Sequence, residues 1–355
     1  MENHIAMMCR YQRQWAEVEA LVCSRGLGTR KVDRDGTRVT EVGEWGRFQG
    51  APVSPLFPWH LRRLRADVVV VHVPNPTAEV GWLLARPRGT LVVRYHSDVV
   101  RQAGAMRFYR PFQMHFLRQA AIILPTSEQY LRTSSALQAL AAKCRAVPLG
   151  IEPEAFAHPD AARVAALRAQ YGGDFVLFSG MHRYYKGLPW LVRAAKGIRS
   201  KLVIAGDGPE RAGCMALAAE LGVEIAFPGA LSQEELVAHL HACAVFAFPS
   251  VERSEAFGIS IMEAHACGKP VVATKLGTGV EFINEDGKTG INVPPRDPEA
   301  LAVAINALLD DPERRAAMGE YARRRIETSF RAEVVARQEF ELYQEAASNV
   351  SGHKA

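Results

Sequence analysis

The sequence lacks long apolar runs and paired cysteines. None of its hydrophobic stretches reaches the roughly 20 residues that a membrane-spanning helix needs. Its start, MENHIAMMCRYQRQW, lacks the order of charged and then apolar residues that is typical of a signal peptide. The six cysteines are scattered and form no Cys-x-x-Cys pair. These absences argue against a disulfide framework and a zinc site, and they predict a cytoplasmic protein with reduced thiols.

Charge is distributed unevenly along the 355 residues. Residues 1–150 carry 21 Lys and Arg against 11 Asp and Glu, a net charge of +10. Residues 151–355 carry 22 against 27, a net charge of −5. The first half therefore has a reason to contact an anionic partner. No recognition module accompanies this charge, so nucleic acid is not the expected partner.

Short β-branched runs alternate with helical patterns along both halves. Buried strands are expected at 67–73, 90–96, 120–127 and 144–150, and again at 174–180, 201–208, 223–229, 243–250 and 269–274. Helical segments such as 105–119 and 128–141 separate them. Continuous apolar strands between helices indicate parallel sheets covered on both faces, so two doubly wound α/β domains are predicted.

The segment 148–161, rich in proline and turn residues, is the expected linker between residues 1–150 and residues 151–332. Two such domains would face a cleft at the carboxyl ends of their strands, where ligands bind in doubly wound sheets. The pattern alone fits nucleotide-dependent transferases, dehydrogenases, kinases and binding proteins, because a fold does not decide a function.

The stretch SEAFGISIMEAHACGKP, residues 254–270, predicts a helix from about Gly258 to Gly268. The N–H groups of Phe257, Gly258 and Ile259 would be free at its start, which suits a phosphate. Glu255 and Glu263 would then be separated by roughly 10 Å, since a helix rises 1.5 Å per residue. That spacing matches a nucleotide sugar, with hydroxyls at both ends of a diphosphate. An isolated pair of glutamates at this spacing is also common by chance.

Other strands of the second half are followed by glycine-rich turns. FSGMHRYYKG (178–187) places Gly180, Arg183 and Lys186 after a strand, where cations can bind a diphosphate. AGDGPER (205–211), with Gly206, and the segment 275–297 are similar turns. Each is also an ordinary joint of this architecture, but four facing one cleft favour a binding site.

These segments, with FPGALSQEEL and GTGVEFINEDGKTGINVPPRDPEAL, resemble the retaining nucleotide-sugar glycosyltransferases of family 4, also called glycosyl transferases group 1. The resemblance covers essentially the whole second half. It implies the GT-B fold of two Rossmann-like domains and transfer without a metal. It also implies that Glu263 binds ribose, that Glu255 contacts the donor sugar, and that the backbone at 257–259 holds the diphosphate.

One position departs from the family pattern. Many members have an arginine directly after the glycine of Gly-Arg-x-x-x-x-Lys-Gly, and here that position is Met181. Either Arg183 supplies the guanidinium or Lys186 acts alone.

In the first half, members commonly carry a histidine after the strand that ends near residue 95. His96 is therefore expected to position the donor sugar and stabilise charge, together with Lys186 and Glu255, although it could also be a loop histidine without a role.

Basic and aromatic residues are interleaved in the first half, at 60–65 and 101–119. The aromatic residues in or directly beside these segments are Trp59, Phe108, Tyr109, Phe112 and Phe116. Residues 101–118 are expected to contact an anionic membrane at the inner face of the cell membrane, since acceptors in this family are often lipid-linked. Solvated arginines around an ordinary core helix are the alternative.

By resemblance, the helix 333–347 should cross back onto the first domain.

The start of the chain also departs from the family, whose members open with an apolar strand and a loop ending in Gly-Gly-x-Glu. Here Met1 and Glu2 take the last two positions of that loop. The first strand of the N-terminal domain is therefore expected to be missing from this sequence, and a native chain longer by roughly 15–20 residues is predicted, enough for one strand and its loop. A divergent start that folds in another way is the alternative.

Together, these features predict a glycosyltransferase that moves a hexose from a nucleotide sugar to a glycan or lipid-linked acceptor in surface polysaccharide or lipopolysaccharide synthesis. GTGVEFIN (277–284) favours GDP-mannose as donor. No cofactor is expected, because no Asp-x-Asp stands at a strand end to bind a metal. The alternatives are an inactive nucleotide-sugar-binding relic, or another GT-B enzyme such as a sugar-phosphate synthase.

Overall fold

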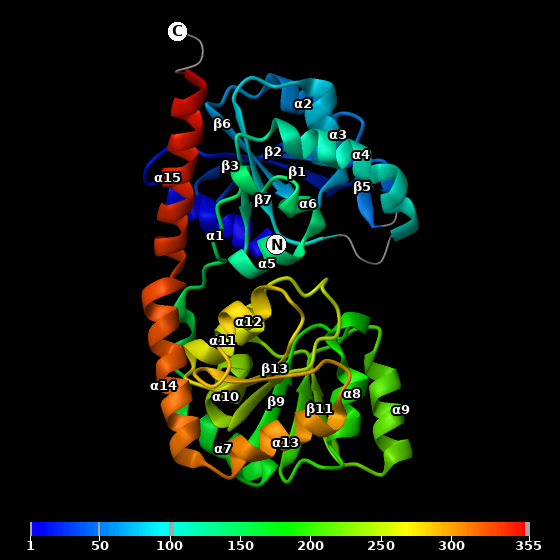
Figure 1. Ribbon diagram of the computed structural model, residues 1–355, viewed down its shortest axis with the longest axis vertical. Helices are drawn as coiled ribbons and strands as arrows, with labels where there is room; N and C mark the ends of the chain where they lie inside the picture. Colours follow the sequence, from blue (N-terminus) through cyan, green and yellow to red (C-terminus); the bar gives the residue numbers. More distant parts are fainter. Residues whose placement is uncertain (1, 49, 99–102, 352–355) are drawn as a thin grey trace. The chain divides into compact units, whose positions relative to one another are not determined.

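The structure, a computed structural model, describes residues 2–48, 50–98 and 103–351 (Figure 1). The chain divides into two compact units. Unit 1 comprises residues 1–150 and 332–355, and unit 2 comprises residues 151–331. In the described part of the chain, no helix is both long enough and apolar enough to cross a membrane.

Unit 2 contains one six-stranded sheet in which all neighbouring strands are parallel. The strand order is β11-β10-β9-β12-β13-β14. This is the order of a doubly wound sheet, and its direction of winding reverses between the neighbouring strands β9 and β12. The strands are β9 (Phe175–Ser179), β10 (Lys201–Ala205), β11 (Ile225–Gly229), β12 (Val245–Phe248), β13 (Val271–Thr274) and β14 (Gly290–Val293).

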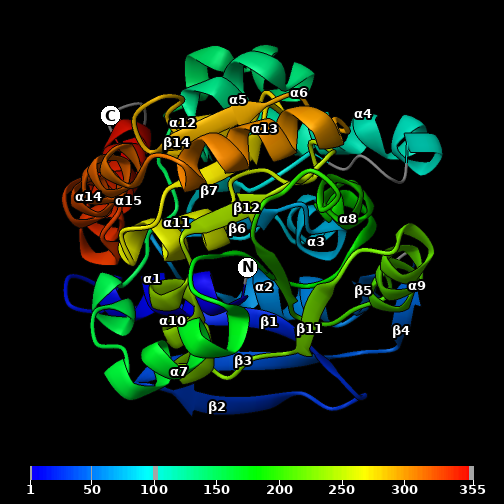
Figure 2. The same cartoon turned by 90° about the horizontal axis from the view of Figure 1, so that it is seen from below.

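Helices cover both faces of this sheet (Figure 2). On one face α8, α9 and α13 bury Val176 and Phe178, whereas their neighbour Leu177 points to the other face, which α7, α10 and α11 cover. Burial on both faces explains why the strands read as continuous apolar runs. The helical segments are η2 (Pro153–Phe156), α7 (Ala161–Tyr171), η3 (Tyr184–Lys186), α8 (Leu188–Ala194), α9 (Arg211–Leu221), α10 (Gln233–Ala242), α11 (Ile259–Ala266), α12 (Gly279–Ile283), α13 (Pro298–Leu309) and α14 (Pro312–Ser329).

The strands of unit 1 form three separate sheets rather than one. The parallel sheet β6-β7-β8 comprises β6 (Val68–Val73), β7 (Thr90–Tyr95) and β8 (Ile122–Pro125), and a mixed sheet has the order β1-β3-β2. The other strands are β1 (Glu19–Arg25), β2 (Arg30–Arg34), β3 (Thr37–Glu44), β4 (Gly46–Phe48) and β5 (Ala51–Val53). Within the described residues, β1 and β6 each have one edge without a strand partner.

The helices of unit 1 include the last helix of the chain, α15 (Ala332–Ser351), which lies alongside α1 (Glu2–Gln12) (Figure 1). Met8 of α1 and Val335 of α15 pack in one core with Val92 of β7 and Leu124 of β8. The remaining helical segments are α2 (Phe57–Arg63), α3 (Pro76–Ala85), α4 (Ala103–Gln119), α5 (Glu128–Thr133), α6 (Ser135–Gln138) and η1 (Ala141–Lys143).

A buried ion pair ties α15 to the parallel sheet of unit 1. Nε of Arg94, in β7, lies 2.9 Å from Oε1 of Glu339, in α15, and both side chains are at most 1% exposed. Arg94 also donates to the carbonyl oxygens of Leu124, Val147 and Pro148. These contacts compensate for the removal of the charges from water.

Two predictions for the first half were wrong. Residues 144–150 form only a single bridge, between Cys144 and Ile123, and no regular strand. The N–H groups of Arg145 and Val147 donate to carbonyls of β8, but Pro125 has no N–H to continue the ladder, and the carbonyls of Val147 and Pro148 accept from Arg94. The five strands between residues 19 and 53 were not expected. β2 is largely exposed and polar, so it carries no apolar run to reveal it. The segment 128–141 folds as short pieces rather than one helix.

Candidate functional site

The loops after β9 and β12 meet at the point where the winding of the unit 2 sheet reverses. These two strands are neighbours, and ligands of doubly wound sheets bind outside the carboxyl ends of such a pair. The N–H of Val251 donates to the carbonyl of Tyr185, at 2.8 Å. Gly187 has φ +67°, and a Cβ there would lie 2.0 Å from the carbonyl oxygen of Pro249. Glycine is therefore required for the two loops to approach this closely.

Lys186 and Glu255, both predicted site residues, form an ion pair across these loops. Nζ of Lys186 lies 2.5 Å from Oε2 of Glu255, and their side chains are 13% and 11% exposed. Ser250, which is fully buried, donates its hydroxyl to the same carboxylate oxygen at 3.2 Å. The pair thus places a positive and a negative group, both mostly removed from water, beside each other at the strand ends.

The predicted helix begins and ends close to the expected residues, as α11 spans Ile259–Ala266. Gly258 is its N-cap with φ +94°, a conformation that favours glycine. In the first turn, the N–H of Ile261 donates to the carbonyl of Gly258 at 3.0 Å, whereas the N–H groups that precede it at a helix start have no acceptor within the helix. Phe257 is a buried core side chain, and Ile259 is exposed, so only their backbone could hold a ligand. The backbone here is suited to an anion.

Glu263 lies on α11 between Met262 and Ala264, which are fully buried, while Glu263 itself is half-buried. Burial raises the pKa of Glu263 to about 7, and the positive charge of Lys186 acts in the opposite direction. Carboxyl groups whose pKa is strongly raised by burial are frequent in functional sites.

Met181, where the sequence departs from the family pattern, and Arg183 are both exposed. Met181 is 54% exposed, and Nε of Arg183 lies 2.9 Å from its sulfur. Neither side chain is held by the core, and both lie in the loop that carries Lys186. His182, between them, is fully buried, and its backbone N–H donates to the carbonyl of Asp207 at 2.8 Å.

The other glycine-rich turns pack against the same loops. A Cβ on Gly206 would lie 2.0 Å from the carbonyl oxygen of Gly180, so the loops after β9 and β10 are in close contact. Gly206 is therefore needed for this loop contact, whereas a ligand was the expected reason. On the other side, Arg253 donates to the carbonyl of Gly277 at 2.9 Å, and the N–H of Gly279 donates to the carbonyl of Ala256 at 2.8 Å. The four turns thus form one continuous loop cluster.

His96 belongs to unit 1, where it follows β7 and is 8% exposed. Its Nε2 lies 2.9 Å from Nδ1 of His72, and the two rings are stacked with centroids 5.2 Å apart. The ring of His4 meets His96 edge-on, with centroids 6.1 Å apart. Burial and the charge of Arg94 lower the pKa of His96, so the imidazole is neutral at physiological pH.

Three residues of these clusters, Ser250, His72 and His4, were not predicted from the sequence. Ser250 lies two residues after β12, and its place after an apolar run, where ligands of such sheets bind, was a signal that could have identified it. His72 interrupts a run of valines in β6 and was noticeable for that reason. His4 gave no signal, because only the fold brings α1 next to β7.

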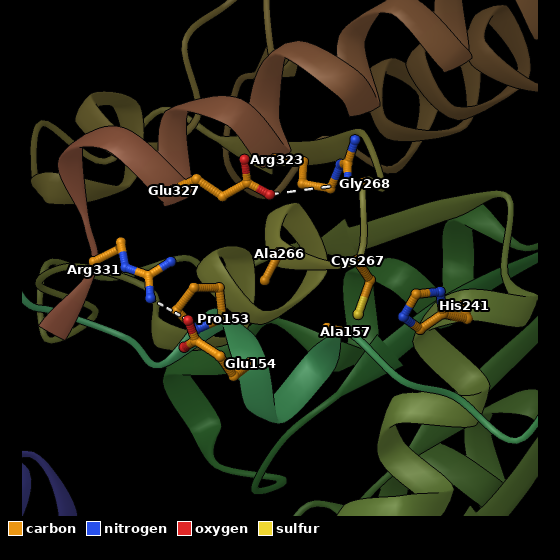
Figure 3. Close-up of a pocket in the computed structure, with 10 residues that line it drawn as sticks. All are labelled: Pro153, Glu154, Ala157, His241, Ala266, Cys267, Gly268, Arg323, Glu327 and Arg331. Atoms are coloured by element: carbon orange, nitrogen blue, oxygen red, sulfur yellow. Dashed lines mark hydrogen bonds and ion pairs between the residues drawn. The ribbon is translucent and has the colours of Figure 1, made fainter.

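A separate pocket of about 400 Å³ lies elsewhere in unit 2 (Figure 3). It is lined by residues of η2, α10, α11 and α14, with Cys267 and His241 at its wall. Its two arginines are paired with carboxylates, Arg331 with Glu154 and Arg323 with Glu327. The predicted site residues do not line this pocket.

Two family models match the chain, one for each unit. Residues 164–325 match the family described as glycosyl transferases group 1, and residues 1–150 match the glycosyl transferase 4-like domain. The first match contains the loop cluster with Lys186, Glu255 and Glu263, and the second contains His96.

Curated relatives are similar over most of their length. The chain is 38% identical to O-antigen chain mannosyltransferase C of Escherichia coli, over 75% of this chain and 72% of the relative. It is 38% identical to the D-rhamnosyltransferase WbpZ of Pseudomonas aeruginosa, over 75% and 70%. It is 37% identical to the GDP-mannose-dependent alpha-(1-6)-phosphatidylinositol monomannoside mannosyltransferase of Mycolicibacterium smegmatis, over 76% and 68%.

The fold is also that of a solved structure, sucrose-phosphate synthase from Thermosynechococcus elongatus. The two align with a TM-score of 0.80 and 24% identity, over 97% of this chain and 92% of the other. The family models, the curated relatives and this fold agree with the predicted resemblance. The chain belongs to the group 1 glycosyl transferases and has the GT-B fold.

Proposed function

We propose that this glycosyltransferase moves a hexose from a nucleotide sugar to a glycan or lipid-linked acceptor in surface polysaccharide synthesis, with retention at the anomeric carbon. The bond from C1 of the sugar to the diphosphate oxygen breaks, and a bond from C1 to the acceptor oxygen forms on the same face. The acceptor hydroxyl loses its proton to the leaving diphosphate. Charge therefore develops on the diphosphate, which positive groups must stabilise.

The observation that carries this proposal is the Lys186–Glu255 pair beside the start of α11. Lys186 supplies a positive charge for the diphosphate, and the first-turn N–H groups of Gly258 and Ile259 supply donors. Glu255 accepts hydrogen bonds from the transferred sugar, and Glu263 accepts them from ribose. Phe257 contributes its backbone, and Arg183 supplies a second positive charge from the exposed loop. Gly180 and Gly206 allow the loops after β9 and β10 to approach each other. His96 orients the sugar.

GDP-mannose is the proposed donor. The names of two relatives include mannosyl transfer, and one of them includes GDP-mannose as donor. The segment 277–284 pointed to the same donor, and its Gly277 and Gly279 contact the loop that carries Glu255. The name of a third relative includes a rhamnosyl group instead, so related GDP-sugars belong in the test.

Transfer is proposed to need no metal, because Lys186 and the α11 start provide the positive charge. We expect transfer to persist in EDTA. Loss of transfer on chelation, with recovery in Mg²⁺ or Mn²⁺, would contradict this part of the proposal.

Donor hydrolysis and transfer across a panel of nucleotide sugars test the proposal. GDP-mannose, GDP-rhamnose, UDP-glucose and ADP-glucose would each be offered with membrane lipid extracts as acceptor. Faster turnover with a GDP-sugar is the expected result. Nucleotide binding without any turnover would instead favour an inactive relic. Turnover only with a sugar phosphate as acceptor would favour a sugar-phosphate synthase.

The acceptor side is proposed to contact an anionic membrane through α4. Phe108 and Phe112 are 79% and 60% exposed, and Arg110 is exposed near them. Phe116, in contrast, is fully buried, so this part of the predicted surface was wrong. Tyr109 donates to Glu79, and this hydrogen bond anchors the helix. Burial, together with the negative charge of Glu79, raises the pKa of Tyr109. Residues 101 and 102 of the predicted segment lie outside the described residues.

Vesicle binding tests this surface. Binding to anionic vesicles should exceed binding to neutral vesicles and should weaken with salt, since charges are screened within about 10 Å at 0.1 M salt. Replacement of Phe108 and Phe112 by serine should weaken it further, and replacement of the exposed Tyr321 of α14 by serine is the control. Equal binding to neutral and anionic vesicles would contradict the proposal.

A further inference from the structure

His96 lies between two other histidines in unit 1, and only one of them is hydrogen-bonded to it. Nδ1 of His72 and Nε2 of His96 are 2.9 Å apart, a distance that requires one nitrogen to donate and the other to accept. His4 is 5% exposed, and both its ring nitrogens are buried without a hydrogen-bond partner among the described residues. His4 therefore packs against His96, and His72 alone determines the state of its Nε2.

All three rings are neutral. Burial lowers the pKa of His4 and of His72 to about 3, and the nearby guanidinium of Arg94 acts in the same direction. Each neutral imidazole then carries one proton, on either Nδ1 or Nε2. A proton in the His72–His96 hydrogen bond thus fixes which nitrogen of His96 is bare.

The direction of this bond follows from the chemistry of the two rings. A free neutral histidine prefers the tautomer with its proton on Nε2. If Nε2 of His96 donates to Nδ1 of His72, both rings have this preferred tautomer. In the opposite direction, both would have the less stable one. The first arrangement is therefore favoured, and it leaves Nδ1 of His96 as an acceptor.

We propose that His72 is a positioning residue for transfer, which holds His96 in the Nε2–H tautomer so that its bare Nδ1 accepts a hydrogen bond from a hydroxyl of the donor sugar. This inference rests on the proposed role of His96. It separates the two parts of that role: a bare nitrogen orients a hydroxyl but does not stabilise a phosphate oxygen, which needs a donor. His72 would then help to select which sugar is transferred.

The tautomer can be measured without any turnover. In ¹⁵N-histidine-labelled protein, two-bond ¹⁵N–¹H correlation spectra distinguish a protonated from a bare ring nitrogen. For His96 we expect a protonated Nε2 and a bare Nδ1 throughout pH 6–8. A protonated Nδ1, or signals averaged between the two tautomers, would overturn the proposal. This result does not depend on whether the protein transfers mannose.

Two substitutions of equal shape test the effect on transfer. His72→Asn places an amide oxygen near the position of Nδ1 and can accept from His96, whereas His72→Leu has the same shape and no acceptor. We expect His72→Asn to stay within about threefold of the wild-type kcat and His72→Leu to lose about tenfold or more, since one hydrogen bond to a ligand is worth about 1–3 kcal/mol. GDP affinity should be unchanged in both.

A deoxy donor identifies the hydroxyl. One monodeoxy GDP-mannose should be a poor substrate of the wild type, and His72→Leu should discriminate less against it.

Equal kcat for His72→Asn and His72→Leu would contradict the proposal. If His72→Leu does not fold, the wild-type tautomer and the activity of His72→Asn still decide. His4→Leu, which disturbs the other side of the His96 ring, is the control and should leave the tautomer unchanged. Absence of turnover with every nucleotide sugar would instead refute the proposed function, and the tautomer would remain interpretable.

Discussion

The two units are built on the same α/β plan but reach it in different ways. Unit 2 has one six-stranded parallel sheet, with helices on both faces. The strands of unit 1 are divided among three sheets, and this unit contains the fully buried Arg94–Glu339 pair and three adjacent histidines, of which His4 and His96 are buried. Unit 2 is thus held by apolar layers, whereas unit 1 depends more on buried polar contacts. The polar contacts of unit 1 are therefore its most sensitive points.

The largest effect is expected from Arg94→Met. This change leaves Glu339 buried and unpaired, so unfolding of unit 1 should become easier by about 3–5 kcal/mol. Hydrogen exchange followed by mass spectrometry reports each unit separately. Exchange should rise in β6 and β7, whereas β9 and β10 should remain protected.

The double variant Arg94→Met/Glu339→Met removes both charges and should recover much of the lost stability, because two apolar side chains replace the pair. If the double variant loses as much stability as Arg94→Met and Glu339→Met lose together, the two side chains act independently, and the ion pair itself does not stabilise the packing of α15. Equal destabilisation of unit 2 would contradict the separation of the two units.

The second effect concerns Lys186→Ala. Removal of the cation that is proposed to bind the diphosphate should lower kcat/KM by about 100-fold, which corresponds to about 2.7 kcal/mol. Lys196→Ala, an exposed lysine of the same unit, is the matched control. Since Glu255 loses its partner, thermal unfolding must be measured as well. Unchanged kcat/KM in a folded Lys186→Ala variant would remove Lys186 from the site.

The same contrast explains what the sequence could predict. Five strands of unit 2 were expected within a few residues. Four of them, β9, β10, β12 and β13, are apolar runs buried on both faces, and the edge strand β11 is a partly buried run that is still largely apolar. The hairpin of β2 and β3, residues 30–44, was missed, because charged residues such as Arg30 and Glu41 pair across it and interrupt any apolar run. β14 was missed within a segment interpreted as a glycine-rich loop, since its Gly290 and Asn292 do not form an apolar run.

For the candidate site, motifs located the residues but not their contacts. The family pattern indicated Lys186 and Glu255. Their ion pair and its link to Ser250 depend on the close approach of the loops after β9 and β12 at Gly187, which the pattern does not specify. The histidines around His96 come from α1, β6 and the end of β7. Such a cluster depends on strand register, which a single sequence does not specify.

A smaller effect is expected from Glu263→Gln on nucleotide binding. If Glu263 accepts hydrogen bonds from ribose, this change should weaken GDP binding by about tenfold, or about 1.4 kcal/mol. The pKa of Glu263 is about 7, so the wild-type affinity should rise with pH through this value as the carboxylate forms, and that rise should be absent in the variant. Calorimetry at several pH values measures both. Unchanged GDP affinity in Glu263→Gln would exclude the ribose role.

The same substitution should stabilise the free protein, and the dependence on pH gives the sign. Burial raises the pKa of Glu263 from 4.5 to about 7, so between these values the folded state binds more protons than the unfolded state. Stability therefore falls as pH rises through this range, and at pH 8 ionised Glu263 disfavours folding. Glu263→Gln should raise the free energy of unfolding by about 1–3 kcal/mol at pH 8 and by almost nothing at pH 4. Glu220→Gln, at an exposed position of α9, should show no such difference. Denaturation with urea at both pH values measures it, and an equal gain at pH 4 and pH 8 would mean that packing rather than charge disfavours Glu263.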